Sequence, residues 1–186
     1  MFYEVEVKSH IRVPPNEFRE DTEKSIRKSL GKKFENFISK DLGVIIGVTD
    51  IVKVGEGIII AGDGAAYYDT TFRMLIYKPE LQEVVMGKVK DISDFGAFMD
   101  IGPLDGMVHI SQTMDDYVTF SKTSSLAGKK SKKVLKVGDV CRARIIAVSF
   151  KDVANPKIGL TMRQPGLGKE EWIKEEKKGK KKEEEK

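Results

Sequence analysis

The chain has 186 residues, enough for one ordinary domain or two small ones, and its hydrophobic fraction of 40% is sufficient for a buried core. Charged residues make up 33%, but the formal net charge is only +4, which does not indicate tight, sequence-specific binding to duplex DNA. The single Cys141 excludes an internal disulfide, and no apolar stretch approaches the ~20 residues that a membrane-spanning helix needs. We therefore expect a cytoplasmic protein with no membrane partner.

The first half of the chain is predicted to contain one strand followed by one helix. Residues 2–13 alternate apolar and polar side chains as a strand does, and Pro14-Pro15 ends that strand. Asn16 can cap a helix that extends to about Leu42, and Gly31 is expected to bend or divide it. The residues that recur near helical spacing are Phe18, Thr22, Ile26, Leu30, Phe34, Phe37 and Ile38.

Three more strands are expected before Pro79, at residues 45–53, 57–61 and 65–77. The last two flank Gly62-Asp63-Gly64, whose residues favour a tight turn at a hairpin tip. The sequence therefore predicts an α+β domain over residues 1–80, with one helix lying on an antiparallel sheet.

The second half, residues 81–165, is predicted to be a small all-β barrel. Its five strand-like runs are residues 84–92, 95–101, 106–110, 140–150 and 157–162. Phe95 and Phe98 fall near His109 in the hairpins of the first three runs. Aromatic rings beside positive charge form a surface for single-stranded nucleic acid, because bases stack on rings whatever their sequence and lysines follow the phosphates.

A long connection separates the third and fourth of these runs. Its section over residues 120–136 has six lysines and no acid, and we expect a mobile basic loop there. Residues 81–168 carry 13 Lys and Arg against 9 Asp and Glu, so the positive excess lies with the barrel. Residues 166–186 are expected to form a charged C-terminal tail, with a short helix around Trp172 and a frayed end.

Residues 87–111, GKVKDISDFGAFMDIGPLDGMVHIS, closely resemble the S-one domain, an RNA-binding OB barrel. The FGAF core, the DG-hydrophobic-VHIS ending, the later VGDV and the final strand over residues 158–162 all match that family. The resemblance implies a five-stranded OB barrel with its RNA-binding face on the strands.

Candidate RNA-binding residues follow from the rings, the basic strands and the basic loop. They are Phe95, Phe98, His109, Lys88, Lys90, Arg142, Arg144, Lys157, Lys129, Lys130, Lys132 and Lys133. Two alternatives stay open: one or more of the rings can belong to the barrel core, and each basic side chain can simply be solvated. No catalytic set, cofactor motif or metal-ligand cluster is visible, so no catalytic residue, cofactor or metal is assigned.

With the first half included, the resemblance extends to nearly the whole chain. The opening MFYEVEVKSHIRVPP, the GDG hairpin and the FRMLIYKP junction are similar to the E-prime family of stalk subunits of archaeal DNA-dependent RNA polymerase, counterparts of the seventh subunit of RNA polymerase II. That resemblance implies a truncated RNP-like first domain that docks on the polymerase core, through the tip at Gly62, Asp63 and Gly64. It also implies a heterodimer with the small helical F subunit of the polymerase, and binding of emerging single-stranded RNA. The alternative is a free-standing translation or RNA-decay factor that carries an S-one domain.

Overall fold

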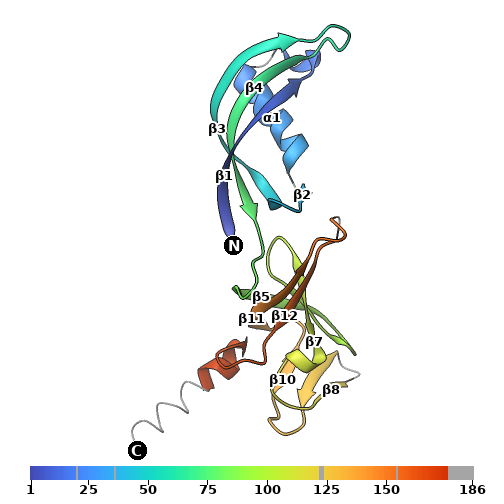
Figure 1. Ribbon diagram of the computed structural model, residues 1–186. Helices are drawn as coiled ribbons and strands as arrows, with labels where there is room; N and C mark the ends of the chain where they lie inside the picture. Colours follow the sequence, from blue (N-terminus) through green and yellow to red (C-terminus); the bar gives the residue numbers. More distant parts are fainter. Residues whose placement is uncertain (20, 36, 122–123, 154, 176–186) are drawn as a thin grey trace, which may run out of the picture. The chain divides into compact units, whose positions relative to one another are not determined.

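The computed structural model describes residues 1–19, 21–35, 37–121, 124–153 and 155–175 (Figure 1). The chain divides into two compact units, Met1–Lys78 and Pro79–Lys186, and each is described by itself. No helix in the described ranges is long and apolar enough to cross a membrane.

The first unit is a four-stranded antiparallel sheet with one helix across it (Figure 1). Strand order in the sheet is β1-β4-β3-β2. The helix packs Ile26 and Leu30 onto Phe72 and Met74, all of which are buried. The elements are β1 (Phe2–Val13), the 3-10 turn η1 (Pro15–Glu17), α1 (Thr22–Phe34), β2 (Ile38–Ser39), β3 (Gly43–Ile59) and β4 (Ala66–Tyr77). The predicted α+β class is confirmed.

The helix is shorter than the periodicity predicted. It begins after Asp21 and ends at Phe34, so Phe18 and Phe37 lie outside it, both exposed. Residues Pro15–Glu17 form a 3-10 turn instead: Pro14 before it is extended, and Pro15 is its first residue, where the fixed φ of proline is tolerated. Gly31 does not divide the helix, since α1 continues through it for three more residues.

Strand β3 replaces two predicted strands by one continuous strand of 17 residues. Its pairing with β4 shifts register at four places, between Ile45 and Gly47, Val48 and Asp50, Ile51 and Lys53, and Val54 and Gly57. Each shift inserts an extra residue and bends the strand, which is why β3 curves along the sheet in Figure 1. Residues 54–56, which the prediction placed between two strands, therefore lie within one bulged strand.

The second unit contains a closed five-stranded barrel, as predicted. Strands follow the order β12-β7-β6-β5-β11, and β11 pairs again with β12 to close the ring; the β7–β12 pair is parallel and the others are antiparallel. Buried side chains such as Val89, Met99 and Cys141 fill the interior. The barrel strands are β5 (Val84–Ser93), β6 (Gly96–Asp100), β7 (Asp105–His109), β11 (Val140–Ser149) and β12 (Lys157–Thr161).

The long connection between β7 and β11 contains strands, which corrects the prediction of a basic loop over residues 120–136. After the 3-10 turn η2 (Ile110–Gln112) it forms a three-stranded antiparallel sheet of β8 (Val118–Ser121), β9 (Ser125–Gly128) and β10 (Val134–Lys136). Leu126 and Leu135, directly opposite each other on β9 and β10, are fully buried. Two leucines among polar residues supplied too weak a pattern to reveal these strands from sequence.

The start of the predicted tail packs onto the barrel. Strand β13 (Gly168–Lys169) pairs with Cys141 and Arg142 of β11, and residues 170–175 are helical. Trp172 and Ile173 of that segment are buried. The expected short helix around Trp172 is therefore present as far as residue 175, and the expected frayed end lies outside the described residues.

The two glycines near the start of β3 allow a test of the sheet. Gly43 has a left-handed φ of +81°, and a Cβ there would clash with the backbone carbonyl of Tyr77 on β4. Gly47 has open space around its Cβ position. We predict that Gly43→Ala lowers the free energy of unfolding by about 2 kcal/mol, while Gly47→Ala changes it by less than about 0.5 kcal/mol. Urea unfolding followed by circular dichroism measures both, and equal losses would contradict the clash.

Candidate nucleic-acid interface

Phe95 and Phe98 lie side by side on the outside of the barrel. Ala97 and Met99 of β6 are fully buried, so the alternation of the strand turns Phe98 outward. Phe95, in the β5–β6 turn, is 48% exposed. The two rings meet edge to face with centroids 5.8 Å apart. Neither ring is fully buried, so both present aromatic surface to solvent.

His109 extends this surface onto β7. It pairs directly with Gly96 across the β6–β7 ladder, and its side chain is exposed. Its Nδ1 atom lies 2.9 Å from Ser111 Oγ and accepts a hydrogen bond from the Ser111 backbone N–H. That bond leaves the proton of the neutral ring on Nε2, where it can be donated to a ligand. A side chain at Gly96 would clash with the carbonyl of Val108, so glycine is what lets the strands approach here.

The predicted strand lysines lie on the same barrel but differ in their partners. Lys88 is exposed opposite Asp100, and Lys157 is exposed at the start of β12, next to the Ile158–Gly106 pair. Lys90 forms an ion pair with Asp105 at 2.8 Å, and this hydrogen-bonded carboxylate raises the Lys90 pKa. Part of its charge is thus compensated within the protein, while Lys88 and Lys157 are better placed to meet phosphates.

Arg142 and Arg144 are not grouped with the rings. Both are on β11, opposite Met86 and Val84 of β5, and β11 is hydrogen-bonded to β5, β12 and β13 rather than to β6 or β7. The sequence placed the two arginines correctly on one side of a strand, but strand order separates them from Phe98 and His109. The closure of the barrel decides which strands are neighbours, and the local sequence pattern does not show how the barrel closes.

The turn between β9 and β10 contains Lys129, Lys130, Lys132 and Lys133, which the sequence placed in a basic loop. We call residues 129–133 the lysine turn. The Asp116 carboxylate holds this turn, accepting hydrogen bonds from the backbone N–H groups of Lys130 and Ser131, both at 2.7 Å. These bonds lower the pKa of Asp116. Lys130 and Lys132 are exposed, and Lys129 lies over the Tyr117 ring, 4.5 Å from its centroid. Tyr117, 68% exposed, was missed in the sequence although an aromatic residue close to a lysine-rich segment is a usable signal.

The predicted docking tip is tied down by a contact that the sequence did not reveal. Asp63 accepts hydrogen bonds from Arg12 Nε at 2.8 Å, from Arg12 Nη2 at 2.6 Å and from the Tyr67 hydroxyl at 2.6 Å. The Arg12 and Tyr67 bonds hold the pKa of Asp63 far below its usual range. Asp63 thus fixes the turn between β3 and β4 instead of offering a free carboxylate to a partner.

Apolar side chains are exposed directly before this turn. Ile58, Ile59 and Ile60 are 63%, 67% and 50% exposed. Three consecutive exposed isoleucines are costly on a surface that stays in water, and such patches mark interaction sites. Within the described residues, no group of three or more His, Cys, Asp or Glu side chains is arranged to hold a metal ion.

Comparison with known families agrees with this two-unit organisation. Residues 8–64 match the family described as "SHS2 domain found in N terminus of Rpb7p/Rpc25p/MJ0397". Residues 78–159 match the S1 RNA binding domain, which confirms the S-one assignment.

Whole-length relatives decide the family. DNA-directed RNA polymerase subunit Rpo7 of Saccharolobus solfataricus is 41% identical over 180 residues, covering 96% of this chain and 100% of that protein. The chain belongs to the Rpo7 family. The Rpo7 of Sulfolobus acidocaldarius is 42% identical over 95% of this chain and 97% of its own length. DNA-directed RNA polymerase III subunit RPC8 of Saccharomyces cerevisiae is 30% identical over 82% of this chain and 74% of its own length.

Membership of the Rpo7 family confirms the resemblance to an archaeal polymerase subunit and the fold predicted with it. It leaves the individual RNA-binding and docking residues as predictions, because a family match does not identify contacts. Among the predicted RNA-binding residues, the structure groups Phe95, Phe98 and His109, here called the ring cluster, and places Lys88 and Lys157 on neighbouring strands. Four other predicted lysines lie together in the lysine turn.

The outward direction of Phe98 has a measurable consequence for stability. We predict that Phe98→Ala lowers the free energy of unfolding by about 1 kcal/mol, because its half-buried ring leaves no cavity in the barrel. The adjacent Met99→Ala is expected to cost about 2–5 kcal/mol, since Met99 is fully buried. Thermal unfolding of the two variants against the parent measures the contrast. A larger loss for Phe98→Ala than for Met99→Ala would place the ring in the core.

Proposed function

We propose that this chain is a non-catalytic stalk subunit of a DNA-directed RNA polymerase. Its first unit docks on the core enzyme, the chain pairs with the F subunit, and the barrel binds emerging single-stranded RNA. The observation that carries the RNA part is the ring cluster exposed on an S-one barrel, with Lys88 on β5 and Lys157 on β12, the strands on either side of β6 and β7. The alternative of a free-standing translation or RNA-decay factor does not account for the match of the first unit to polymerase subunits.

The chemistry of the ring cluster favours weak sequence selectivity. Every base has a π-face, so stacking on Phe95 and Phe98 discriminates little between bases. His109 contributes a hydrogen-bond donor through Nε2, while Lys88 and Lys157 meet phosphates. The lysine turn adds further positive charge for phosphates. Binding by these means falls steeply with salt.

Removal of the rings tests the RNA-binding surface. We predict that Phe95→Ala/Phe98→Ala/His109→Ala weakens binding of a 12-nucleotide RNA, at about 1–3 kcal/mol per stacked base removed. Fluorescence anisotropy at fixed salt measures the affinity. The matched control is Phe37→Ala, which removes an exposed ring from the other unit and should leave the affinity unchanged.

Charge and stacking can be separated in the same assay. Replacing Lys129, Lys130, Lys132 and Lys133 by Gln should flatten the dependence of log affinity on log salt, by about 0.7 for each phosphate that the lysines no longer meet.

A folded ring variant that keeps the parental affinity would show that the barrel binds RNA elsewhere or not at all.

Docking of the first unit is attributed to the isoleucine patch, Ile58, Ile59 and Ile60. The ion pair of Arg12 with Asp63 holds the adjacent turn, so the patch is presented without a large ordering cost on binding. Apolar side chains of this kind supply the buried centre that stable interfaces have. Gly62, Asp63 and Gly64 then act by shaping the tip.

We predict that Ile58→Asp/Ile59→Asp reduces recovery of this chain with core polymerase about thirtyfold, the effect of removing one interface hot spot of ~2 kcal/mol. The control is Ile46→Asp, the same change at an exposed position near the other end of β3. Co-purification from co-expressing cells gives the recovery, and size-exclusion chromatography with the F subunit shows whether the heterodimer persists. Equal recovery of the patch variant and the control would remove the patch as the anchor.

A further inference from the structure

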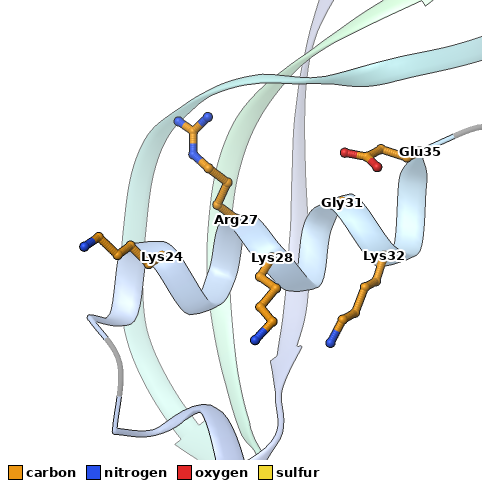
Figure 2. A pocket seen from close by; sticks show the side chains of 6 residues that line it. All are labelled: Lys24, Arg27, Lys28, Gly31, Lys32 and Glu35. Carbon is orange, nitrogen blue, oxygen red and sulfur yellow. The ribbon is translucent and has the colours of Figure 1, made fainter.

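Helix α1 carries a row of positive charge that the proposed function does not use. From Lys24 to Lys33 the helix has five basic residues and no acidic one. Lys24, Arg27, Lys28 and Lys32 follow helical spacing and are all exposed; in Figure 2 Lys28 and Lys32 point to one side of the helix and Arg27 to the other. At 1.5 Å per residue the row extends over roughly 12 Å. We call it the basic row.

Two surface hollows flank the helix and share Lys32. The first, of about 450 Å³, is lined by the four residues of the basic row together with Gly31 and Glu35. The second, of about 540 Å³, receives Lys32, Lys33, Arg12 and His10. Glu35 is the only carboxylate among the described residues that line either hollow. The lining therefore favours an anionic ligand that lies along the helix.

The positive charge exceeds what the protein itself neutralises. Lys28 and Lys32 both contact the Glu17 carboxylate, at 3.4 and 3.1 Å, and the Glu17 side chain is only 5% exposed. The hydrogen bond from Lys32 lowers the Glu17 pKa, so one ionised carboxylate faces two lysines. Arg27 lies 4.0 Å from Asp50, with both side chains more than half exposed, a pair that contributes little.

Gly31 lines the first hollow together with Glu35. It lies within the helix between the turn of Arg27 and Lys28 and the turn of Lys32, and Glu35 is beside it (Figure 2). A Cβ at this position would lie 3.0 Å from Glu35 Oε1, so any side chain here would push the carboxylate aside. The missing side chain therefore leaves room for the Glu35 carboxylate to lie against the helix at this point.

We propose that the outer face of α1 binds the phosphodiester backbone of a nucleic acid, as a second contact independent of the barrel. A protein partner would need an apolar or aromatic anchor, and the basic row has none. A nucleic-acid strand offers repeated single charges, which a row of lysine and arginine heads matches without reading sequence. This contact goes beyond the proposed function, and it holds or fails separately from the ring cluster.

The test removes charge without disturbing the buried Glu17. Lys24→Gln/Arg27→Gln/Lys33→Gln leaves Lys28 and Lys32 on that carboxylate, so the helix keeps its anchor. The matched control is Lys40→Gln/Lys53→Gln/Arg73→Gln, three exposed basic residues of the same unit that line neither hollow. Both triple variants are made in the full chain, with and without the ring substitutions at Phe95, Phe98 and His109.

Affinity is measured by anisotropy between 50 and 300 mM salt for three probes of one sequence: single-stranded RNA, single-stranded DNA and duplex DNA. We expect the helix variant to lower the magnitude of the log-affinity slope by up to about 2 on single strands, and the control to leave it unchanged. The reduction should persist when the ring cluster is absent. A reduction on one probe class only still supports the contact and identifies its strand.

Equal slopes for the helix variant and the control on all three probes would overturn the proposal. Reduced recovery with core polymerase at unchanged slopes would overturn it as well, in favour of an acidic protein surface. Loss of RNA affinity in the ring variant alone tests the proposed function and has no bearing on this outcome.

Discussion

The parallel pairing of β7 with β12 is the constraint on which the RNA-binding surface depends. It places Gly106 opposite Ile158 and Val108 opposite Leu160, and Leu160 fills the space that a side chain at Gly106 would occupy. With β11 paired to the other edge of β12, the sheet is closed and each strand has one inner and one outer face. Apolar side chains fill the inner face, so the rings and the lysines at outer positions point away from the interior of the barrel.

A comparable constraint organises the first unit. The Glu17 carboxylate is buried beneath α1, and a buried charge is tolerated only when it is paired and hydrogen-bonded. Lys28 and Lys32 supply that pairing, while Ser25 donates its hydroxyl to the Glu17 backbone carbonyl at 2.9 Å. The start of the helix and the turn before it are thus joined by polar contacts, in addition to the packing of Ile26 and Leu30.

Local sequence patterns predicted the features that depend on the alternation or spacing of neighbouring residues, such as strands and helices. The FGAF run predicted the strand, but it left open whether Phe98 faces the core, and only the burial of Ala97 and Met99 on either side shows that the ring points outward. Patterns failed where the deciding contact is distant: Arg12 and Asp63 are 51 positions apart, and nothing near either residue signals their pairing. Local patterns also failed where the signal was weak. A bulge of β3 lies where the sequence predicted a gap between two strands, and the strands on either side of the lysine turn bury only two leucines.

The separation of Arg142 and Arg144 from the ring cluster has the same origin. Their alternation along β11 is local and was predicted, but their neighbours are set by barrel closure. Sequence therefore indicates which residues face out, and only the topology indicates which of them face the same ligand.

The single cysteine has a practical consequence. Cys141 is fully buried in the barrel, and burial raises its pKa to about 12, so at neutral pH it is a protonated thiol out of reach of solvent. The thiolate is the form that attacks thiol reagents such as maleimides, so a buried, protonated thiol of this kind is inert. A cysteine introduced at an exposed position, such as Tyr117 beside the lysine turn or Lys24 on α1, would take a maleimide dye selectively in the otherwise native chain. Distances between dyes at such positions would then report the separation of the two units in solution.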